Sequence, residues 1–418
     1  MLRRVGRFVA GVVLCSLSMG ALGTSAFAAS QLPLVSSKGL DQKELVKLTS
    51  EAANWTPIMV KPYVAPQLFK GSEQQWHVIY DLLLTNFNSH PSTIKEIQIL
   101  GRNSAAEDWK PVKTLSGPEL IKNFTRLAGD KDAPLTLDAA KVGVVWVNIS
   151  WDKESDAPAE LTHRLVFDSK NQFGTPHLYD YTCAEIKIDK KPVVVISPPL
   201  KGGKWLVAGG YIGKLGHRTA LFPLDNDLHS AQPYAIDWQR LDEKNYSSTD
   251  ITKNESNRSY NEPVYAVADG TVLGVNNRFI DQPPQKPVGD ERLLWPAGNS
   301  LVLDIGNGYY VMYAHMRKDS IKFKPGDKVK RGEQIGNVGS TGNSYGAHLH
   351  MHVTSNPGLL GADGVPYLFD KFDVIGELKN LDKYDEVEGA GRPHEVIDSK
   401  FNGVHHNELP REGVLLSL

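Results

Sequence analysis

Histidine is concentrated in the carboxy-terminal half of this chain. Of its 13 histidines, six lie between residues 217 and 352, and three of these alternate in Ala347-His348-Leu349-His350-Met351-His352. Alternate side chains of a β-strand point to the same face, so the three rings would project from one face, about 6–7 Å apart. Neutral imidazole is a good zinc ligand. The alternation therefore favours a metal site over the alternative, a solvated histidine-rich edge.

Two further segments each set one polar side chain in an apolar strand. Asp237 lies in Tyr234-Ala235-Ile236-Asp237-Trp238, and His315 lies in Tyr313-Ala314-His315-Met316. A buried carboxylate is costly unless it has a hydrogen-bonding, cationic or metal partner. Each residue alone is typical of an ordinary structural position. Together with the histidine triplet, they could surround one metal ion and the water beside it.

The elements that must position these residues are predicted to be short antiparallel strands. Residues 265–273 form two short apolar runs around Asp269-Gly270, which is a strong signal for a hairpin. Pro325-Gly326-Asp327 and Arg331-Gly332-Glu333 are further turns between short strands. This half of the chain is therefore predicted to be an antiparallel, barrel-like β-domain.

A second all-β domain is predicted before it. Apolar residues alternate at period two in residues 78–84, 145–151 and 161–167, with turn-rich stretches between them. The pattern indicates a β-sandwich, immunoglobulin-like in a loose sense. His163 lies on the apolar face of its strand and is predicted to be a core residue. Prolines and glycines in residues 197–203 indicate the domain boundary.

The first residues have the pattern of a secretory signal. Three arginines precede the short apolar run Phe8–Leu17, and Ala26-Phe27-Ala28 offers a cleavage site. After removal of this segment Cys183 would be the only thiol, and it is predicted to be buried and inert. No further membrane span is expected. The expected organisation is a signal peptide at 1–28, a lead-in segment at 29–67, the sandwich at 68–198, the barrel-like domain at 204–375 and a peripheral tail at 376–418.

Composition narrows the function. The chain has 46 Lys+Arg against 48 Asp+Glu, a formal net charge of −2, so it lacks the basic footprint of a nucleic-acid-binding protein. The length of 418 residues is enough for two domains with cores of their own. An exported protein, periplasmic or extracellular, is expected.

Several motifs in residues 205–370 resemble the M23 (lysostaphin/LytM-type) zinc metallopeptidases. They are Ala347-His348-Leu349-His350, the strand that contains His315, Pro263–Gly270 and Gly339-Ser340-Thr341-Gly342-Asn343-Ser344. The motifs occur in the family's order, and the amino-terminal sandwich is not covered by the resemblance. The resemblance implies a zinc peptidase domain.

The resemblance to the M23 metallopeptidases also implies roles for individual residues. Asp237 and His350 would be Zn²⁺ ligands, and His348 and His315 would lie beside the zinc-bound water. The family's first histidine usually stands four residues before the aspartate, where this chain has Pro233. The first ligand is then His217 or, as the alternative, His229; we favour His217.

His352 continues the same strand face at a position where the resemblance implies no catalytic role. It is predicted to support the site from behind or to be merely solvated.

The resemblance and the signal together imply a zinc endopeptidase that cuts peptides of bacterial peptidoglycan. One alternative is a catalytically inactive binding or regulatory module of the cell envelope that keeps the same domain. A histidine-rich metal carrier is a third hypothesis, but it would explain neither Asp237 nor the Gly339–Ser344 loop.

Overall fold

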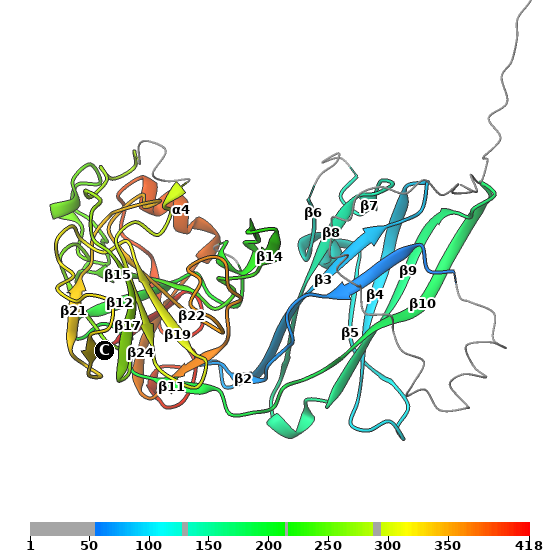
Figure 1. Ribbon diagram of the computed structural model, residues 1–418, viewed down its shortest axis with the longest axis horizontal. Helices are drawn as coiled ribbons and strands as arrows, with labels where there is room; N and C mark the ends of the chain where they lie inside the picture. The colour runs from blue at the N-terminus through cyan, green and yellow to red at the C-terminus, as the bar shows by residue number, and fades with distance from the viewer. Residues whose placement is uncertain (1–54, 128–132, 214–215, 287–293) are drawn as a thin grey trace, which may run out of the picture. The chain divides into compact units, whose positions relative to one another are not determined.

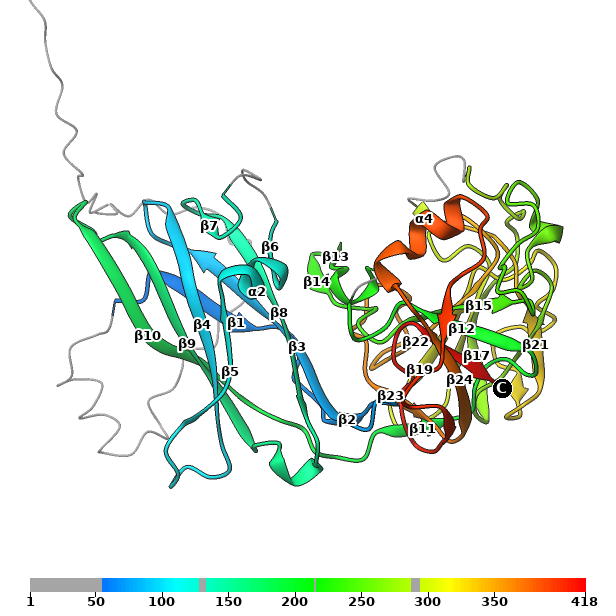
Figure 2. The ribbon, with the colours of Figure 1, turned by 180° about the vertical axis from the view of Figure 1, so that it is seen from behind.

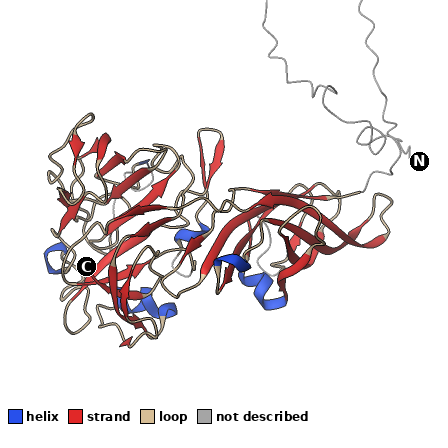
Figure 3. Ribbon diagram, turned by 90° about the horizontal axis from the view of Figure 1, so that it is seen from below, coloured by secondary structure: helices blue, strands red, loops and turns tan. Residues whose placement is uncertain are grey.

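A computed structural model describes residues 55–127, 133–213, 216–286 and 294–418 of the chain. Within these ranges the fold is all-β, as predicted, and Figure 3 shows strands throughout. The two α-helices that the described residues form are short, Gly117–Lys122 (α2) and Tyr384–Gly389 (α4). Neither has the length or the apolar character that a membrane crossing requires. The expected signal peptide lies outside the described residues.

Two antiparallel sheets form the amino-terminal sandwich. One has the strand order β1-β3-β8-β6 with β2 beside β3, and the other has the order β10-β9-β4-β5 with β7 beside β4 (Figure 1). The strands of the first sheet are β1 (Ile58–Pro62), β2 (Phe69–Lys70), β3 (Trp76–Asn86), β6 (Phe124–Arg126) and β8 (Val142–Trp151). Those of the second are β4 (Ser92–Arg102), β5 (Lys110–Ser116), β7 (Thr136–Leu137), β9 (Glu160–Lys170) and β10 (Pro176–Lys187).

The period-two pattern explains how these sheets pack. Val78, Tyr80, Leu82 and Leu84 of β3 are all buried, in one cluster with apolar residues of β4, β8 and β9. The sandwich predicted from the alternation is therefore present, and its immunoglobulin-like character stays a prediction.

His163 is a core residue of this sandwich, as predicted. Its side chain is buried, with Nε2 2.7 Å from the Tyr80 hydroxyl and Nδ1 3.0 Å from the Ala184 carbonyl oxygen. Burial lowers the pKa of His163 to about 4, so the ring is neutral at neutral pH.

The carboxy-terminal part is built on one sheet of 11 strands among the described residues. Its order is β20-β17-β18-β19-β22-β15-β12-β27-β24-β25, with β26 beside β24, and every pairing in it is antiparallel. The strands are β12 (Lys204–Ala208), β15 (Ile236–Leu241), β17 (Gly270–Asn276), β18 (Ser300–Asp304), β19 (Tyr310–Ala314), β20 (Lys328–Val329), β22 (Leu349–Thr354), β24 (Phe372–Leu378), β25 (Val396–Ile397), β26 (Gly403–His405) and β27 (Val414–Ser417).

Three small two-stranded sheets complete this part. They pair β16 (Pro263–Tyr265) with β21 (Gln334–Asn337), β13 (Phe222–Leu224) with β14 (Asp227–His229), and β11 (Val194–Ile196) with β23 (Tyr367–Phe369), the last pair being parallel.

The strands expected to carry the chemistry are central in the large sheet. β19, β22 and β15 are consecutive neighbours, and Figure 2 shows β19 and β22 side by side. Their apolar side chains, Tyr313, Leu349 and Trp238 among them, are fully buried in the core beneath. This core fixes the backbone positions from which the polar side chains project.

The structure differs from the expected organisation at three places. β1 lies within the expected lead-in segment but pairs with β3 of the sandwich. β11 precedes the expected boundary but pairs with β23. The expected tail contributes β25–β27 to the large sheet, where Leu416 of β27 pairs with Trp205 of β12. The tail is thus not peripheral, because its apolar residues 414–416 are buried in that sheet.

Candidate metal centre

Two of the candidate residues face each other across neighbouring strands. In the antiparallel register of β15 and β22, Asp237 lies directly opposite His350. Side chains at directly opposite positions have Cβ atoms about 4.5–5.5 Å apart, so they can share a partner. His350 Nδ1 lies 2.8 Å from Asp237 Oδ1. Strand pairing alone therefore brings together one carboxylate and one imidazole.

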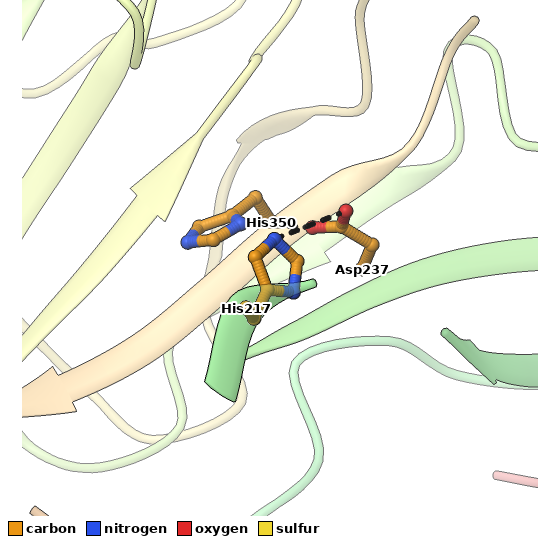
Figure 4. A group of neighbouring side chains, drawn as sticks. All are labelled: His217, Asp237 and His350. Carbon is orange, nitrogen blue, oxygen red and sulfur yellow. Dashed lines mark hydrogen bonds and ion pairs between the residues drawn. The ribbon is translucent and has the colours of Figure 1, made fainter. Parts of the chain in front are cut away.

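His217 joins them from a different element. It begins a 3₁₀ turn, His217–Thr219 (η2), and its Nε2 lies 3.4 Å from Asp237 Oδ2. Figure 4 shows the three side chains of His217, Asp237 and His350 pointing toward one another. One potential ligand atom from each residue lies within 4.8 Å of the other two. His229, the alternative first ligand, lies in β14 and does not belong to this group.

The three donors suit a zinc ion. Ligand atoms bound at about 2.1 Å in a tetrahedron are about 3.4 Å apart, close to the 3.4 Å between His217 and Asp237. Nitrogen and carboxylate oxygen are the atoms zinc prefers beside thiolate. A set of three protein donors would also leave one position of a tetrahedron open, as in catalytic rather than structural zinc sites.

The ring of His217 is held by packing. Its Nδ1 is buried and has no hydrogen-bond partner among the described residues, and a Cβ added to Gly209 would lie 2.2 Å from that atom. Gly209 has φ 76°, a conformation that favours glycine. The missing side chain at this position therefore makes room for the imidazole.

The residue next to His217 is fixed by a buried ion pair. The Arg218 guanidinium is 3% exposed and donates to Asp81 Oδ1 of β3, which is 2% exposed. It also donates to the carbonyl oxygens of Tyr80 at 2.9 Å and Val147 at 3.2 Å. Three acceptors from β3 and β8 thus hold the turn that presents His217.

His348 and His315 are oriented by backbone carbonyls. His348 Nδ1 lies 2.8 Å from the Gly346 oxygen, and His315 Nδ1 lies 2.8 Å from the Thr341 oxygen. A carbonyl only accepts, so each Nδ1 carries the proton and each Nε2 presents a lone pair when the ring is neutral. His348 Nε2 lies 3.6 Å from Asp237 Oδ2, and the His315 and His348 ring centroids are 4.7 Å apart.

His315 also has an uncommon backbone conformation. Its φ is 59°, in the left-handed region that residues other than glycine seldom occupy. Strained backbone of this kind persists where the surrounding structure enforces it. Here the backbone N–H donates to the Ala297 carbonyl at 2.9 Å, while the ring is bonded to Thr341.

The ionisation states match a metal-binding set. Burial alone would raise the pKa of Asp237, but the rings of His217, His348 and His350 outweigh it and hold this pKa well below its usual range. Burial lowers the pKa of His217 to about 4, and burial with His348 and His350 nearby lowers the pKa of His315 well below 6.5. The site therefore offers an ionised carboxylate beside the neutral imidazoles of His217 and His315.

His352 lies behind this group. It is 1% exposed, its Nδ1 is 2.8 Å from His350 Nε2, and its Nε2 is 3.2 Å from the Leu359 carbonyl oxygen. Burial, with His350 nearby, also lowers the pKa of His352 well below 6.5. Of the two roles expected from the sequence, support from behind agrees with this burial and a solvated face does not.

The group lines a cleft of about 550 Å³. Its floor includes the two strands that carry Asp237 and His350, and α4 forms part of its wall. The further lining residues include Gln232, Ser247, Lys253, Asn257, Gln285, Tyr345, Tyr384, Asp385 and Glu388. The α4 residues were not predicted, because the charged composition after residue 375 gave no signal of a cleft. The apolar run Val414–Leu416 is the feature that could have tied that segment to the sheet.

Comparison with known proteins locates a family segment. Residues 254–358 match the family described as Peptidase family M23, which confirms the resemblance identified in the sequence. The matched segment contains His315, His348 and His350, whereas His217 and Asp237 precede it.

Relatives of this segment are known. A stretch of 91 residues is 39% identical to the peptidoglycan DD-endopeptidase ShyA of Vibrio cholerae serotype O1 and covers 22% of this chain and 17% of that protein. ShyB of the same organism is 36% identical with the same coverage. The chain thus spans about a sixth of the length of these relatives. The catalytic domain of lysostaphin from Staphylococcus simulans is 20% identical, over 39% of this chain and 88% of that domain, with a TM-score of 0.23.

Proposed function

We propose that this chain, whose residues 254–358 match Peptidase family M23, is an exported zinc metallo-endopeptidase acting on peptides of bacterial peptidoglycan. The observation that carries the proposal is the convergence of His217, Asp237 and His350, with one ligand atom each within 4.8 Å of the others. The relatives named as peptidoglycan endopeptidases support the substrate class. The pattern of residues 1–28 supports export.

His217, Asp237 and His350 would hold the metal, which is proposed to be Zn²⁺. When bound there, zinc supplies Lewis acidity that activates water and polarises a peptide carbonyl. The ionised state of Asp237 and the neutral state of His217 mean that this part of the ligand set needs no proton removed at neutral pH.

His348 and His315 are proposed to transfer the proton of the attacking water. The Nδ1 proton of His348 is donated to the Gly346 carbonyl oxygen, which leaves a lone pair on Nε2 that faces the site. Nε2 therefore accepts the proton of the attacking water. The protonated ring then donates from Nε2 to the oxyanion of the tetrahedral intermediate or to the leaving amine. His315 presents a second Nε2 beside it, fixed by Thr341, which can accept and return a proton in the same way.

The test compares three variants of the full chain for bound zinc and for cleavage of purified peptidoglycan. His217→Ala and Asp237→Asn are expected to lose stoichiometric zinc and to cleave more than about a hundredfold more slowly. His229→Ala is the matched control, since this histidine stands outside the cluster, and it should keep both properties.

Either of two results would overturn the proposal. The first is full zinc content and activity in Asp237→Asn. The second is a parent protein that binds no zinc and cleaves nothing, which would instead favour a non-catalytic module of the cell envelope.

A further inference from the structure

His352 has both ring nitrogens engaged. Nε2 faces the Leu359 carbonyl oxygen at 3.2 Å, and Nδ1 faces His350 Nε2 at 2.8 Å. Since neither nitrogen is directed at Asp237 or the cleft, His352 is not available as a further ligand. Its burial, at 1% exposed, also leaves no role as a solvated surface residue.

The direction of these hydrogen bonds follows from the carbonyl. The Leu359 oxygen can only accept, so His352 Nε2 must carry its ring's proton and Nδ1 must accept. The donor to His352 Nδ1 is then His350 Nε2, which must carry a proton as well. The Gln232 side-chain amide also approaches His350 Nε2, at 3.4 Å, and its oxygen could share this proton if the amide is turned.

This chain of bonds determines which nitrogen of His350 is free for a metal. With the proton held on Nε2, the lone pair of a neutral His350 is on Nδ1, the atom that lies 2.8 Å from Asp237 Oδ1. Nδ1 is thus the nitrogen on the side of Asp237, and Nε2 is the nitrogen on the side of His352.

We propose that His352 is a positioning residue that fixes the orientation of His350 and keeps its proton on Nε2, so that Nδ1 is presented to the metal. The chain runs from the Leu359 carbonyl through His352 to His350. This inference rests on the proposed function, because it assigns His350 as a zinc ligand. Partners behind metal-bound histidines commonly change metal affinity 10- to 100-fold when they are removed.

The test uses two replacements of nearly equal shape. His352→Asn keeps an acceptor oxygen where Nδ1 stands, and His352→Leu removes it. In competition with a chromophoric chelator, His352→Leu is expected to bind zinc about 10- to 100-fold more weakly than the parent, and His352→Asn within about threefold of it. Urea unfolding of both variants separates this effect from loss of the fold. Equal zinc affinity in the parent and both folded variants would overturn the inference.

A spectroscopic measurement determines directly which ring nitrogen of His350 carries the proton. Long-range ¹H–¹⁵N correlation of the full chain labelled at histidine should show His350 protonated at Nε2, both in zinc-free protein and after zinc is added. An unprotonated Nε2 in either state would overturn the inference, even if the His352→Leu variant failed to fold. A parent that binds no zinc would overturn the proposed function, while the Nε2 proton of His350 would still decide the role of His352.

Discussion

Replacing Gly209 by alanine is expected to disable the metal site by displacing His217. A Cβ at this position would lie 2.2 Å from His217 Nδ1, where ordinary contact begins at about 3.4 Å. The ring must therefore retreat by about 1.2 Å, whereas metal–ligand distances tolerate only about 0.2 Å. His217 Nδ1, the atom that the added Cβ would meet, has no hydrogen-bond partner among the described residues, so no hydrogen bond on that side of the ring opposes the shift.

The effect of Gly209→Ala has two parts that can be measured separately, a loss of stability and a loss of zinc affinity. Alanine at φ 76° carries a backbone cost of about 1–2 kcal/mol, which lowers the free energy of unfolding. The displaced ring adds a loss of zinc affinity, and a misplacement of about 1 Å also costs about a hundredfold in rate. Gly202→Ala is the matched control, because Gly202 has φ 60° and an added Cβ there meets no atom within 4 Å.

Urea unfolding and chelator competition measure the two parts on the same samples. Both variants should lose similar stability, but only Gly209→Ala should lose zinc affinity and peptidoglycan cleavage. If Gly209→Ala binds zinc as tightly as Gly202→Ala, then the packing account of His217 is wrong.

Two further predictions concern buried ionisable groups. Burial lowers the pKa of His163 from 6.5 to about 4, so this histidine takes up a proton at a higher pH in the unfolded chain than in the folded one. The contribution of His163 to the free energy of unfolding is therefore fully present above about pH 6.5 and is lost as the pH falls toward 4. In urea unfolding between pH 7 and pH 4.5, the free energy of unfolding of the parent should fall by about 2 kcal/mol more than that of the non-titrating His163→Gln, and parallel pH profiles would contradict this. Asp81→Asn leaves the Arg218 charge buried without its counter-ion and should lower the free energy of unfolding by about 3 kcal/mol, whereas Asp81→Leu with Arg218→Met should recover much of it. A loss below about 1 kcal/mol in Asp81→Asn would show that the pair is not buried in solution.

The candidate site was predictable to the extent that it follows from strand patterns. A single carboxylate in the apolar strand around Asp237, and a histidine every second residue around His350, indicate polar side chains held on buried strands. The register that places Asp237 opposite His350 belongs to a pairing of segments more than a hundred residues apart. Periodicity within one strand contains no information on its partner, so this proximity could not be predicted from the pattern alone.

The two candidates for the first ligand illustrate the same limit. His217 and His229 both precede Asp237, and each lies in a segment with no strong helical or strand pattern. What separates them is the path of the chain: the 3₁₀ turn at His217 is fixed by Arg218 on Asp81, while His229 lies in the β13–β14 hairpin. The hairpin at His229 is a local pairing, whereas Arg218 and Asp81 are 137 residues apart in sequence, so the position of His217 could not be predicted from its local pattern.

The amino-acid order by itself determined the all-β class, the alternation that builds both cores, the chemical nature of the donor residues and the match to Peptidase family M23, because these depend on residue type and local spacing. The tertiary structure decided which histidine approaches Asp237, which nitrogen of each ring faces the cleft, and that residues 376–418 complete the sheet and wall the cleft. These features depend on the meeting of distant segments, where one carbonyl or one missing Cβ determines the orientation of a ring.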